Sequence, residues 1–258
     1  MEPNGKPSYS GRLLRKGAFV EETYQIFGHW TDGEDLKENL KRIQETNLIG
    51  ASNESWLKEV CQTLSNRFSH GDSIEPLVTL ARQRFPLDQW KFCLLWHFGS
   101  TDGIFGAFAK EMLFSDLNDG IEVLSTDHVS PFVEEIYRTR LKKEISQYGR
   151  IRMARDLLRM GADFDLLEGT PHRRFRHAHI PDEAVLYAVY SLMDQTGSAH
   201  MMLQSDRWRL FLMGQDDVER ELMNLHQFNR LRYESAGTVR ELSLPFSNLA
   251  EYAQSLVS

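Results

Sequence analysis

The sequence predicts a mainly α-helical, compact bundle with helix-turn-helix-like elements and one short C-terminal β-hairpin, in the order of a winged helix. Three observations support this prediction. Helix-forming residues such as Leu, Met, Glu, Arg and Lys are abundant, whereas the chain has only 17 Gly and 8 Pro. Apolar residues recur at helical spacing along most of the chain. A segment near the C-terminus, residues 230–244, is typical of a β-hairpin.

The length and composition are those of a folded protein with a substantial core. With 258 residues, 41% of them hydrophobic, a chain of this kind commonly divides into subdomains. We expect a disordered tail at residues 1–10 and an N-terminal helix-turn-helix-like subdomain at 11–72. A central helical layer with a basic helix and linker follows at 73–179, and a C-terminal winged-helix-like subdomain at 180–258.

Nothing in the sequence predicts export or membrane insertion. The first ten residues lack the apolar core of a signal peptide. The most apolar stretch, residues 92–114, is interrupted by charged residues and glycines, whereas a membrane span needs about 20 nearly uninterrupted apolar residues. Both cysteines, Cys61 and Cys93, lie in apolar helical stretches and are predicted to be small core residues. We therefore expect a cytoplasmic protein that makes no contact with a membrane.

The N-terminal subdomain is predicted to hold three helices. Ser10 could cap a helix over residues 12–27, and a second helix follows from Glu34. A third starts at Asn53, with Trp56 and the apolar residues after it on one inward face. Its outward positions are side chains that can donate hydrogen bonds to phosphates or base edges: Lys58, Gln62 and Asn66, with Arg67 beside them.

Two amphipathic helices joined by a glycine turn are typical of a helix-turn-helix, in which the second helix enters the DNA major groove. An ordinary helical hairpin with a solvated face is the alternative, and this segment by itself favours that alternative. The middle of the chain is predicted to form helices over residues 76–84, 87–98 and 104–117, and a longer one from Pro131. Pro76 and Pro131 suit first-turn positions, and Gly99, Gly103 and Gly106 suit turns and close helix packing.

Charge is distributed unevenly along the chain. The net charge is −7, but residues 138–179 contain eleven Lys and Arg against five Asp and Glu, so the remainder carries −13. In the helix over residues 150–160, Arg152, Arg155 and Arg159 share the outer face, with Arg150 at its start. The linker after this helix adds Arg173, Arg174 and Arg176. Arginine without matching acids suggests anion binding, although a merely solvated face remains an open alternative.

The C-terminal part is predicted to be helical from Asp182, at 206–213 and at 216–227, and then to form the hairpin. With a loop at Ala236–Gly237, Leu231 faces Leu242, Arg232 faces Glu241 and Tyr233 faces Arg240, which are favourable cross-strand pairs. Helices followed by a hairpin have winged-helix order. Arg232 and Arg240 are then the candidates for phosphate contacts from a wing, and a structural flap is the alternative.

No constellation in the sequence indicates catalysis. The chain has no phosphate loop or dinucleotide fingerprint, and no serine in a nucleophile elbow. His172, His177 and His179 cluster, but no further ligands at fixed spacing complete a metal site. Asp163, Asp165 and Glu168 lack the spacing of a calcium loop. We expect no catalytic residue, no metal, no cofactor and no small-molecule substrate.

Three segments carry a resemblance to a known family. They are Ser10-Gly-Arg-Leu-Leu-Arg-Lys-Gly-Ala-Phe-Val-Glu-Glu-Thr-Tyr24, Asn47-Leu-Ile-Gly-Ala-Ser52 and the helix end Leu64-Ser-Asn-Arg-Phe68. They resemble the BrxA family of bacteriophage-exclusion (BREX) defence systems, and the order of the later elements is also similar. The motifs are loose patterns of apolar and basic residues. Some relatives have been labelled membrane proteins, which the hydropathy of this chain does not support.

The resemblance implies a largely α-helical, non-catalytic protein with helix-turn-helix elements that binds double-stranded DNA. It would act beside the methyltransferase, ATPase and phosphatase-like components of the defence system, and the family supplies no catalytic residues to carry over. The first hypothesis is therefore a DNA-binding accessory factor whose partners are double-stranded DNA and other defence-system subunits. The second is a helical scaffold whose basic surface docks those subunits. A transcriptional regulator is a weaker third, because no effector pocket is indicated.

Overall fold

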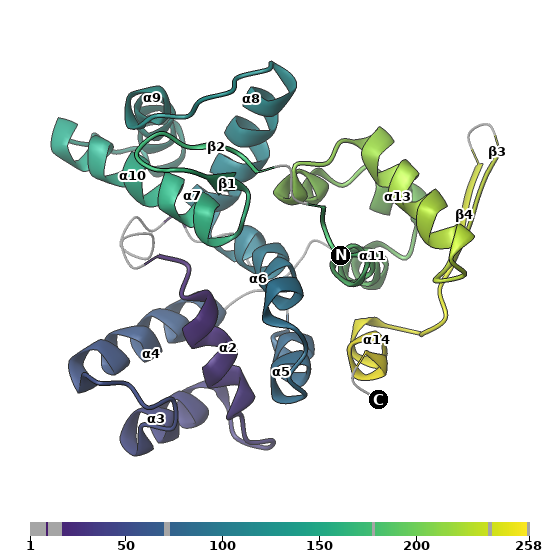
Figure 1. The fold of residues 1–258 in the computed structure, drawn as a ribbon, viewed down its shortest axis with the longest axis horizontal. Coiled ribbons are helices and arrows are strands. Elements are labelled where there is room, and N and C mark those ends of the chain that lie inside the picture. Colours follow the sequence, from purple (N-terminus) through teal and green to yellow (C-terminus); the bar gives the residue numbers. More distant parts are fainter. Residues whose placement is uncertain (1–8, 10–16, 70–72, 177–178, 237–238, 257–258) are drawn as a thin grey trace.

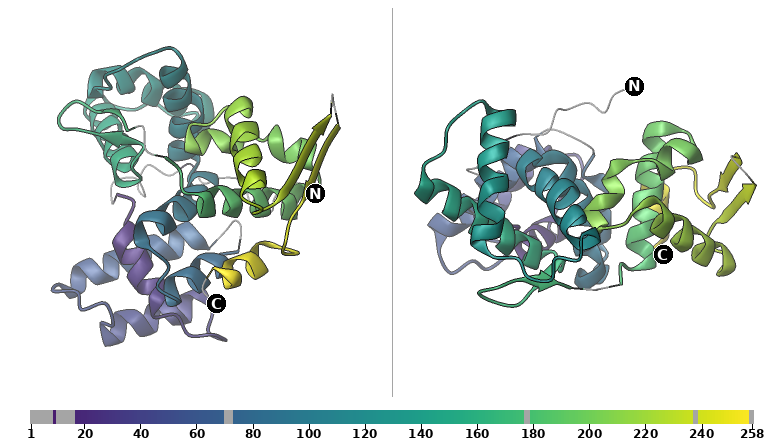
Figure 2. Two further views of the ribbon diagram at one scale, coloured as in Figure 1. Left: turned by 45° about the vertical axis from the view of Figure 1, so that its right-hand side comes forward. Right: turned by 90° about the horizontal axis from the view of Figure 1, so that it is seen from above.

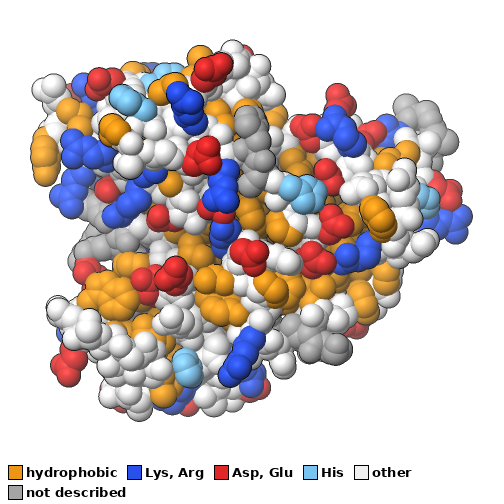
Figure 3. All heavy atoms as spheres, viewed as in Figure 1, with side chains coloured by type: hydrophobic (Ala, Val, Ile, Leu, Met, Phe, Trp, Pro, Cys, Tyr) orange, Lys and Arg blue, Asp and Glu red, His pale blue; other side chains and the backbone are white. Residues whose placement is uncertain are grey.

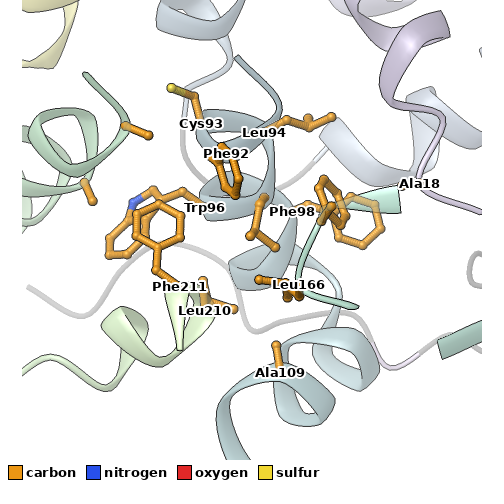
Figure 4. Packing of buried hydrophobic residues seen from close by; sticks show 14 of the residues in the cluster. Ala18, Phe92, Cys93, Leu94, Trp96, Phe98, Ala109, Leu166, Leu210 and Phe211 are labelled. Atoms are coloured by element: carbon orange, nitrogen blue, oxygen red, sulfur yellow. The ribbon is translucent and has the colours of Figure 1, made fainter. Parts of the chain in front are cut away.

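The computed structural model describes residues 9, 17–69, 73–176, 179–236 and 239–256, and three groups of helices surround a central helix in it (Figure 1). The central helix, α6 (Leu87–Thr101), is buried on nearly every side. A helix that is apolar all round belongs in a protein core. Figure 4 shows Phe92, Trp96 and Phe98 of α6 pointing in different directions into packed neighbours. Among the described residues, no helix combines the length and apolarity needed to cross a membrane.

The N-terminal group contains α2 (Val20–Gly28), α3 (Leu36–Thr46) and α4 (Glu54–Phe68). Asn53 caps α4 as predicted, because its side chain accepts a hydrogen bond from the Trp56 amide at 3.2 Å. Among the described residues the first helix begins at Val20, so the predicted helix over residues 12–27 is not continuous. Gly17 and Phe19 have φ of 80° and 54°, which a right-handed helix cannot contain. The predicted cap Ser10 and most of the predicted tail lie outside the described residues.

One core position predicted for α4 is wrong. Trp56 is 36% exposed, and its ring packs edge-on against Phe19 with centroids 6.3 Å apart. The other apolar positions of this face, from Leu57 to Phe68, are buried.

Two glycines allow the central helices to pack closely. After α5 (Glu75–Arg82), where Pro76 sits in the first turn as predicted, α6 leads through Asp102 into α7 (Gly103–Ala107). The π-helical η1 (Phe108–Leu113) and α8 (Phe114–Asn118) continue the same rod. A Cβ atom on Gly106 would overlap the Gly99 carbonyl, and one on Gly99 would overlap the Leu210 side chain. The predicted role of these glycines in close packing is therefore confirmed.

The helices α7, η1 and α8 form a second group with α9 (Thr126–Ile136), the π-helical η2 (Tyr137–Leu141) and α10 (Gln147–Asp163). The prediction that a helix starts at Pro131 is wrong. Ser125 caps α9 by accepting a hydrogen bond from the His128 amide at 3.2 Å, so Pro131 lies inside the helix. A small antiparallel pair, β1 (Leu167–Glu168) and β2 (Arg174–Phe175), packs beside α10.

The C-terminal group starts with α11 (Asp182–Thr196), α12 (Ala199–Leu203) and the 3₁₀ helix η3 (Asp206–Phe211). It continues with α13 (Gln215–Gln227), β3 (Arg232–Ala236), β4 (Val239–Ser243) and α14 (Leu249–Ser255). The helices and the hairpin follow in the predicted order, while the winged-helix assignment stays a prediction. α14, which was not predicted, packs against α5 and α11 and joins this group to the middle of the molecule.

Candidate nucleic-acid interface

The basic helix α10 presents its arginines on one side and its apolar residues on the other. Ser146 caps the helix, and its hydroxyl accepts a hydrogen bond from the Gly149 amide at 3.1 Å. Met153, Ala154, Leu157 and Leu158 are buried, and α10 packs mainly against α9. Arg152, Arg155 and Arg159 are exposed on the opposite side, as predicted from their spacing. We call these three residues the basic stripe.

Two arginines of the basic stripe lack an acidic partner among the described residues. The third, Arg159, is 47% exposed and pairs with Asp156 of the same helix at 3.9 Å. For Arg152 and Arg155, the described part of the chain supplies no ion pair. Figure 3 shows Lys and Arg side chains gathered over α10, whereas acids and bases alternate over the C-terminal group. Arg152 and Arg155 therefore provide positive charge that no acidic side chain of the described residues neutralises.

Most of the other predicted cations in this region have structural partners. Arg150 pairs with Glu134 of α9, and Arg176 pairs with Asp165 at 2.8 Å. Arg173 donates a hydrogen bond to the Gly169 carbonyl. Arg174 is exposed in β2, directly opposite Glu168 on β1. Among the linker arginines, Arg174 is therefore the one whose side chain forms no ion pair or hydrogen bond within the described residues.

The outward stripe predicted for α4 is exposed in the structure. Lys58, Gln62 and Asn66 all face solvent, and we call them the α4 stripe. The prediction that Arg67 belongs beside them is wrong. Position 67 lies about 100° further round the helix than position 66, on the side that the chain before α2 covers. Arg67 is only 4% exposed.

Arg67 acts instead as a clamp on the N-terminal segment. Its guanidinium donates to the carbonyl oxygens of Gly17 and of Ala18, the latter at 2.9 Å, and lies 4.6 Å from the ring centroid of Phe98. Burial lowers the pKa of Arg67 to about 10, against the opposing effect of Asp102 and Asp163. It therefore stays charged at neutral pH, buried against main-chain oxygens.

Asp102 is the buried acid that faces this cation. One of its oxygens, Oδ1, caps α7 by accepting hydrogen bonds from the amides of Ile104 and Phe105, at 3.2 and 3.0 Å. The other, Oδ2, is buried and accepts no hydrogen bond within the described residues. Burial raises the pKa of Asp102 to about 6, although the α7 amides and Arg67 lower it.

Helices α4 and α10 both hold the same short segment of the chain. α4 holds residues 17–18 through Arg67, and α10 holds them through Asp163, which accepts a hydrogen bond from the Ala18 amide at 3.1 Å. A cavity of about 360 Å³ lies at this junction and is lined by Gly17 to Glu22, Arg159 and Asp163. Figure 1 shows α4 and α10 in neighbouring groups on the same side of the molecule. The tertiary structure thus places both predicted DNA-binding helices around one junction.

The predicted hairpin forms, but its register is wrong. Tyr233 pairs with Leu242, Glu234 with Glu241 and Ser235 with Arg240, so the predicted loop residue Ala236 is part of β3. Tyr233 is 2% exposed. Burying this ring against an apolar neighbour stabilises the fold more than a surface ion pair, which contributes about 0–1 kcal/mol to stability. The register therefore follows burial, and it leaves two glutamates directly opposite each other.

The two arginines of the hairpin pair with other residues than the predicted cross-strand partners. Arg232 pairs with Glu234 of its own strand at 2.6 Å and remains 71% exposed. Arg240 is only 18% exposed and pairs with Glu219 of α13 at 3.1 Å. The hairpin and α10 lie at opposite ends of the molecule in Figures 1 and 2. Arg232 and Arg240 thus do not extend the surface formed by the basic stripe.

Helix α13, which precedes the hairpin, is acidic. Its 13 residues carry four Asp or Glu and a single Arg, Arg220. In a winged helix, the helix before the wing would meet DNA phosphates, which repel acidic side chains. The charge of α13 therefore weighs against DNA contact at this end of the molecule.

Several exposed residues next to the basic stripe were not among the predicted ones. Lys142 and Lys143 are exposed in the loop between η2 and α10. Tyr148, one turn before Arg152, is 74% exposed. The spacing of positions 148, 152, 155 and 159 places them in one row of a helix, which is the sequence signal that could have identified Tyr148.

The described residues offer little for metal or thiol chemistry. In that part of the chain, no three His, Cys, Asp or Glu side chains gather as metal ligands would. His177 lies outside the described residues, and His179 is 3.8 Å from Asp182. Both cysteines are buried, as predicted, and burial raises the pKa of Cys61 to about 11 and that of Cys93 also. Their thiols are therefore protonated at neutral pH and poorly nucleophilic.

The family model of BrxA matches residues 7–189 of the chain. The protein belongs to the BrxA family. BrxA proteins are components of BREX phage-defence systems, so this is a phage-defence protein of the BREX type. No curated protein matches the chain.

The BrxA match covers one part of the predicted interface and not the other. Residues 7–189 include α4 and α10, and with them both stripes. Helix α13 and the β3–β4 hairpin follow after the matched region. The features that relate this chain to BrxA therefore include the basic end of the molecule, and exclude the hairpin.

Proposed function

We propose that this BrxA-family protein binds double-stranded DNA through the basic stripe of α10, as a non-catalytic accessory factor of its defence system. The observation that supports this most is the exposure of Arg152 and Arg155 on a capped helix, with no acidic partner within the described residues. Arginine guanidinium groups pair well with phosphate oxygens.

The stripe has a suitable size for a duplex backbone. From Arg152 to Arg159 the helix rises about 10 Å. Duplex DNA presents about one phosphate charge per 1.7 Å of its axis, so roughly six phosphates lie within that length. The negative charge on the rest of the chain, −13 outside residues 138–179, would limit contact to the basic end.

The α4 stripe would provide the second contact. Lys58 can neutralise a phosphate, while the amide groups of Gln62 and Asn66 can donate to and accept from base edges. Because α4 and α10 both hold residues 17–18, their relative position is fixed at that end by hydrogen bonds. Binding to α10 alone would be insensitive to DNA sequence, and any sequence preference would come from α4.

A pair of substitutions on α10 tests the proposal. Arg152→Gln with Arg155→Gln should weaken binding to several unrelated duplexes about equally, measured by fluorescence anisotropy across a salt series. Each lost phosphate contact lowers the slope of log affinity against log salt by about 0.9, so the double variant should lose nearly 2. A matched control, Arg82→Gln with Arg220→Gln, removes the same charge from two exposed ion pairs elsewhere. The control should keep the wild-type slope.

Equal affinity and slope in the α10 variant and the wild type would exclude the stripe as the contact surface. A folded wild-type protein that bound no duplex at all would instead favour the alternative function. In that case, the basic stripe would dock acidic surfaces on other defence-system subunits, and the same α10 variant should weaken their association.

The non-catalytic part of the proposal has its own test. The buried, protonated cysteines and the lack of a candidate metal group within the described residues provide no reacting centre. Purified protein should therefore neither hydrolyse nucleotides nor cut DNA when Mg²⁺ or Mn²⁺ is added. Nuclease or ATPase activity that co-purifies with the protein, and is lost through a point mutation in it, would contradict this.

A further inference from the structure

The most exposed large apolar side chain among the described residues lies on the basic helix. Tyr148 is 74% exposed, in the first turn of α10. The ring lies one helical turn before Arg152, and its hydroxyl makes no hydrogen bond within the described part of the chain. The cap at Ser146 and the buried Met153 fix the backbone that carries it. The fold therefore presents this aromatic ring to solvent from a rigid position.

Tyr148 continues the row of the basic stripe. Positions 148, 152, 155 and 159 are four, three and four residues apart, which places them on one side of a helix over about 16 Å. The loop before α10 adds the exposed Lys142 and Lys143, with the exposed Glu144 beside them. An aromatic ring thus lies between two sources of positive charge.

A charged track beside an exposed aromatic ring is the arrangement that binds unpaired bases. The cations follow the backbone, while the ring stacks on a base face. In an intact duplex the base faces are covered by neighbouring base pairs, so Tyr148 could touch only sugars or base edges there. Opened, gapped or frayed DNA exposes these faces next to a backbone that the arginines can follow.

We propose that Tyr148 stacks on an unpaired base, and that α10 therefore binds DNA best where double-stranded DNA is locally opened. This inference rests on the proposed function and specifies the DNA that the same surface recognises. It assigns the arginines to affinity for any backbone and Tyr148 to discrimination between paired and unpaired bases.

Two probes and three variants test the inference. The probes are a blunt duplex and the same duplex with an internal stretch of unpaired thymines, each titrated by fluorescence anisotropy. Wild-type protein should bind the second probe more tightly. Tyr148→Ala should weaken that binding about fivefold to a hundredfold, the usual effect of removing one stacked aromatic side chain, and should change duplex binding less than about twofold.

The variants separate stacking from other roles of this side chain. Tyr148→Phe keeps the ring and should retain the preference for unpaired bases. The control Phe228→Ala removes a ring that is 67% exposed next to the acidic α13, and should bind both probes as the wild type does. The salt slope of Tyr148→Ala should equal that of the wild type, because no charge is lost.

Each contrary result has a distinct meaning. If the wild type binds both probes equally, or if Tyr148→Ala weakens both by the same factor, Tyr148 does not read unpaired bases and the inference is wrong. In those cases the basic stripe can still bind duplex DNA. If the wild type binds neither probe, both the inference and the proposed function are wrong.

Discussion

Replacing Arg67 with Ala should destabilise the protein strongly without changing its DNA contact surface. The side chain is 4% exposed and joins α4 to the carbonyls of Gly17 and Ala18. Hydrogen bonds that involve a charged group contribute about 1.5–3 kcal/mol each, and removing one partner of a buried charge pair costs about 3–5 kcal/mol. These contributions overlap, so we expect a loss of about 3–5 kcal/mol. For a chain of this size that lowers Tm by roughly 6–20 °C.

The loss should depend on pH because Asp102 faces the same cation. Burial raises the pKa of Asp102 to about 6 even with Arg67 present. Below that pH the carboxyl is protonated and gains little from the cation, whereas above it the variant would bury an uncompensated carboxylate. The destabilisation by Arg67→Ala should therefore be larger at pH 7.5 than at pH 5.

Urea denaturation followed by circular dichroism at both pH values measures these differences. Lys58→Ala, on the exposed side of the same helix, is the control and should stay within about 0.5 kcal/mol of the wild type. The reasoning would be refuted if Arg67→Ala cost less than about 1 kcal/mol at pH 7.5. A lowered salt slope of DNA binding in a folded Arg67→Ala variant would restore Arg67 as a DNA contact.

Three further predictions follow from the described contacts. Alanine at any single position of the α4 stripe should lower DNA affinity and leave Tm nearly unchanged in thermal melts, because these side chains are exposed; a large loss of stability would mean that the stripe is buried. If the hairpin is a DNA-binding wing, Arg232→Gln and Arg240→Gln should each lower the salt slope of DNA binding by about one. Arg240→Gln should in addition reduce stability, because it breaks the half-buried pair with Glu219. Unchanged slopes for both variants would make the hairpin a structural flap. The stability of the wild type should fall by about 3 kcal/mol as the pH rises from about 4 to about 6, since the raised pKa of Asp102 favours the folded state only while the carboxyl is protonated. Asp102→Asn should remove this fall. Urea denaturation at several pH values would contradict the prediction if the stability of both proteins changed equally with pH.

Much of the secondary structure could be predicted from the sequence because its determinants are local. The cap at Asn53, the start at Asp182 after a proline and the apolar face of α10 each involve residues within a few turns of one another. The exposure of the basic stripe and of the α4 stripe followed from the same periodicity. The family, too, could be identified from short segments of the sequence.

Other features depended on contacts between residues far apart in the chain. Periodicity places a side chain on a face of its helix, but which faces are covered depends on other segments. Arg67 is buried because the chain 49 and 50 residues earlier crosses its side of α4. The hairpin register follows the burial of Tyr233, and the charge of Arg240 is satisfied by Glu219 on another element.

The sequence by itself determined a helical protein of the BrxA family with a basic helix and an exposed polar stripe on α4. The tertiary structure decided which of the predicted cations remain exposed, and which of them lie near one another. Arg152 and Arg155 stay exposed beside Tyr148, while Arg150 and Arg176 are held in ion pairs. The physical reason is that charge and periodicity are properties of the local sequence, whereas burial and pairing arise only when distant segments pack together.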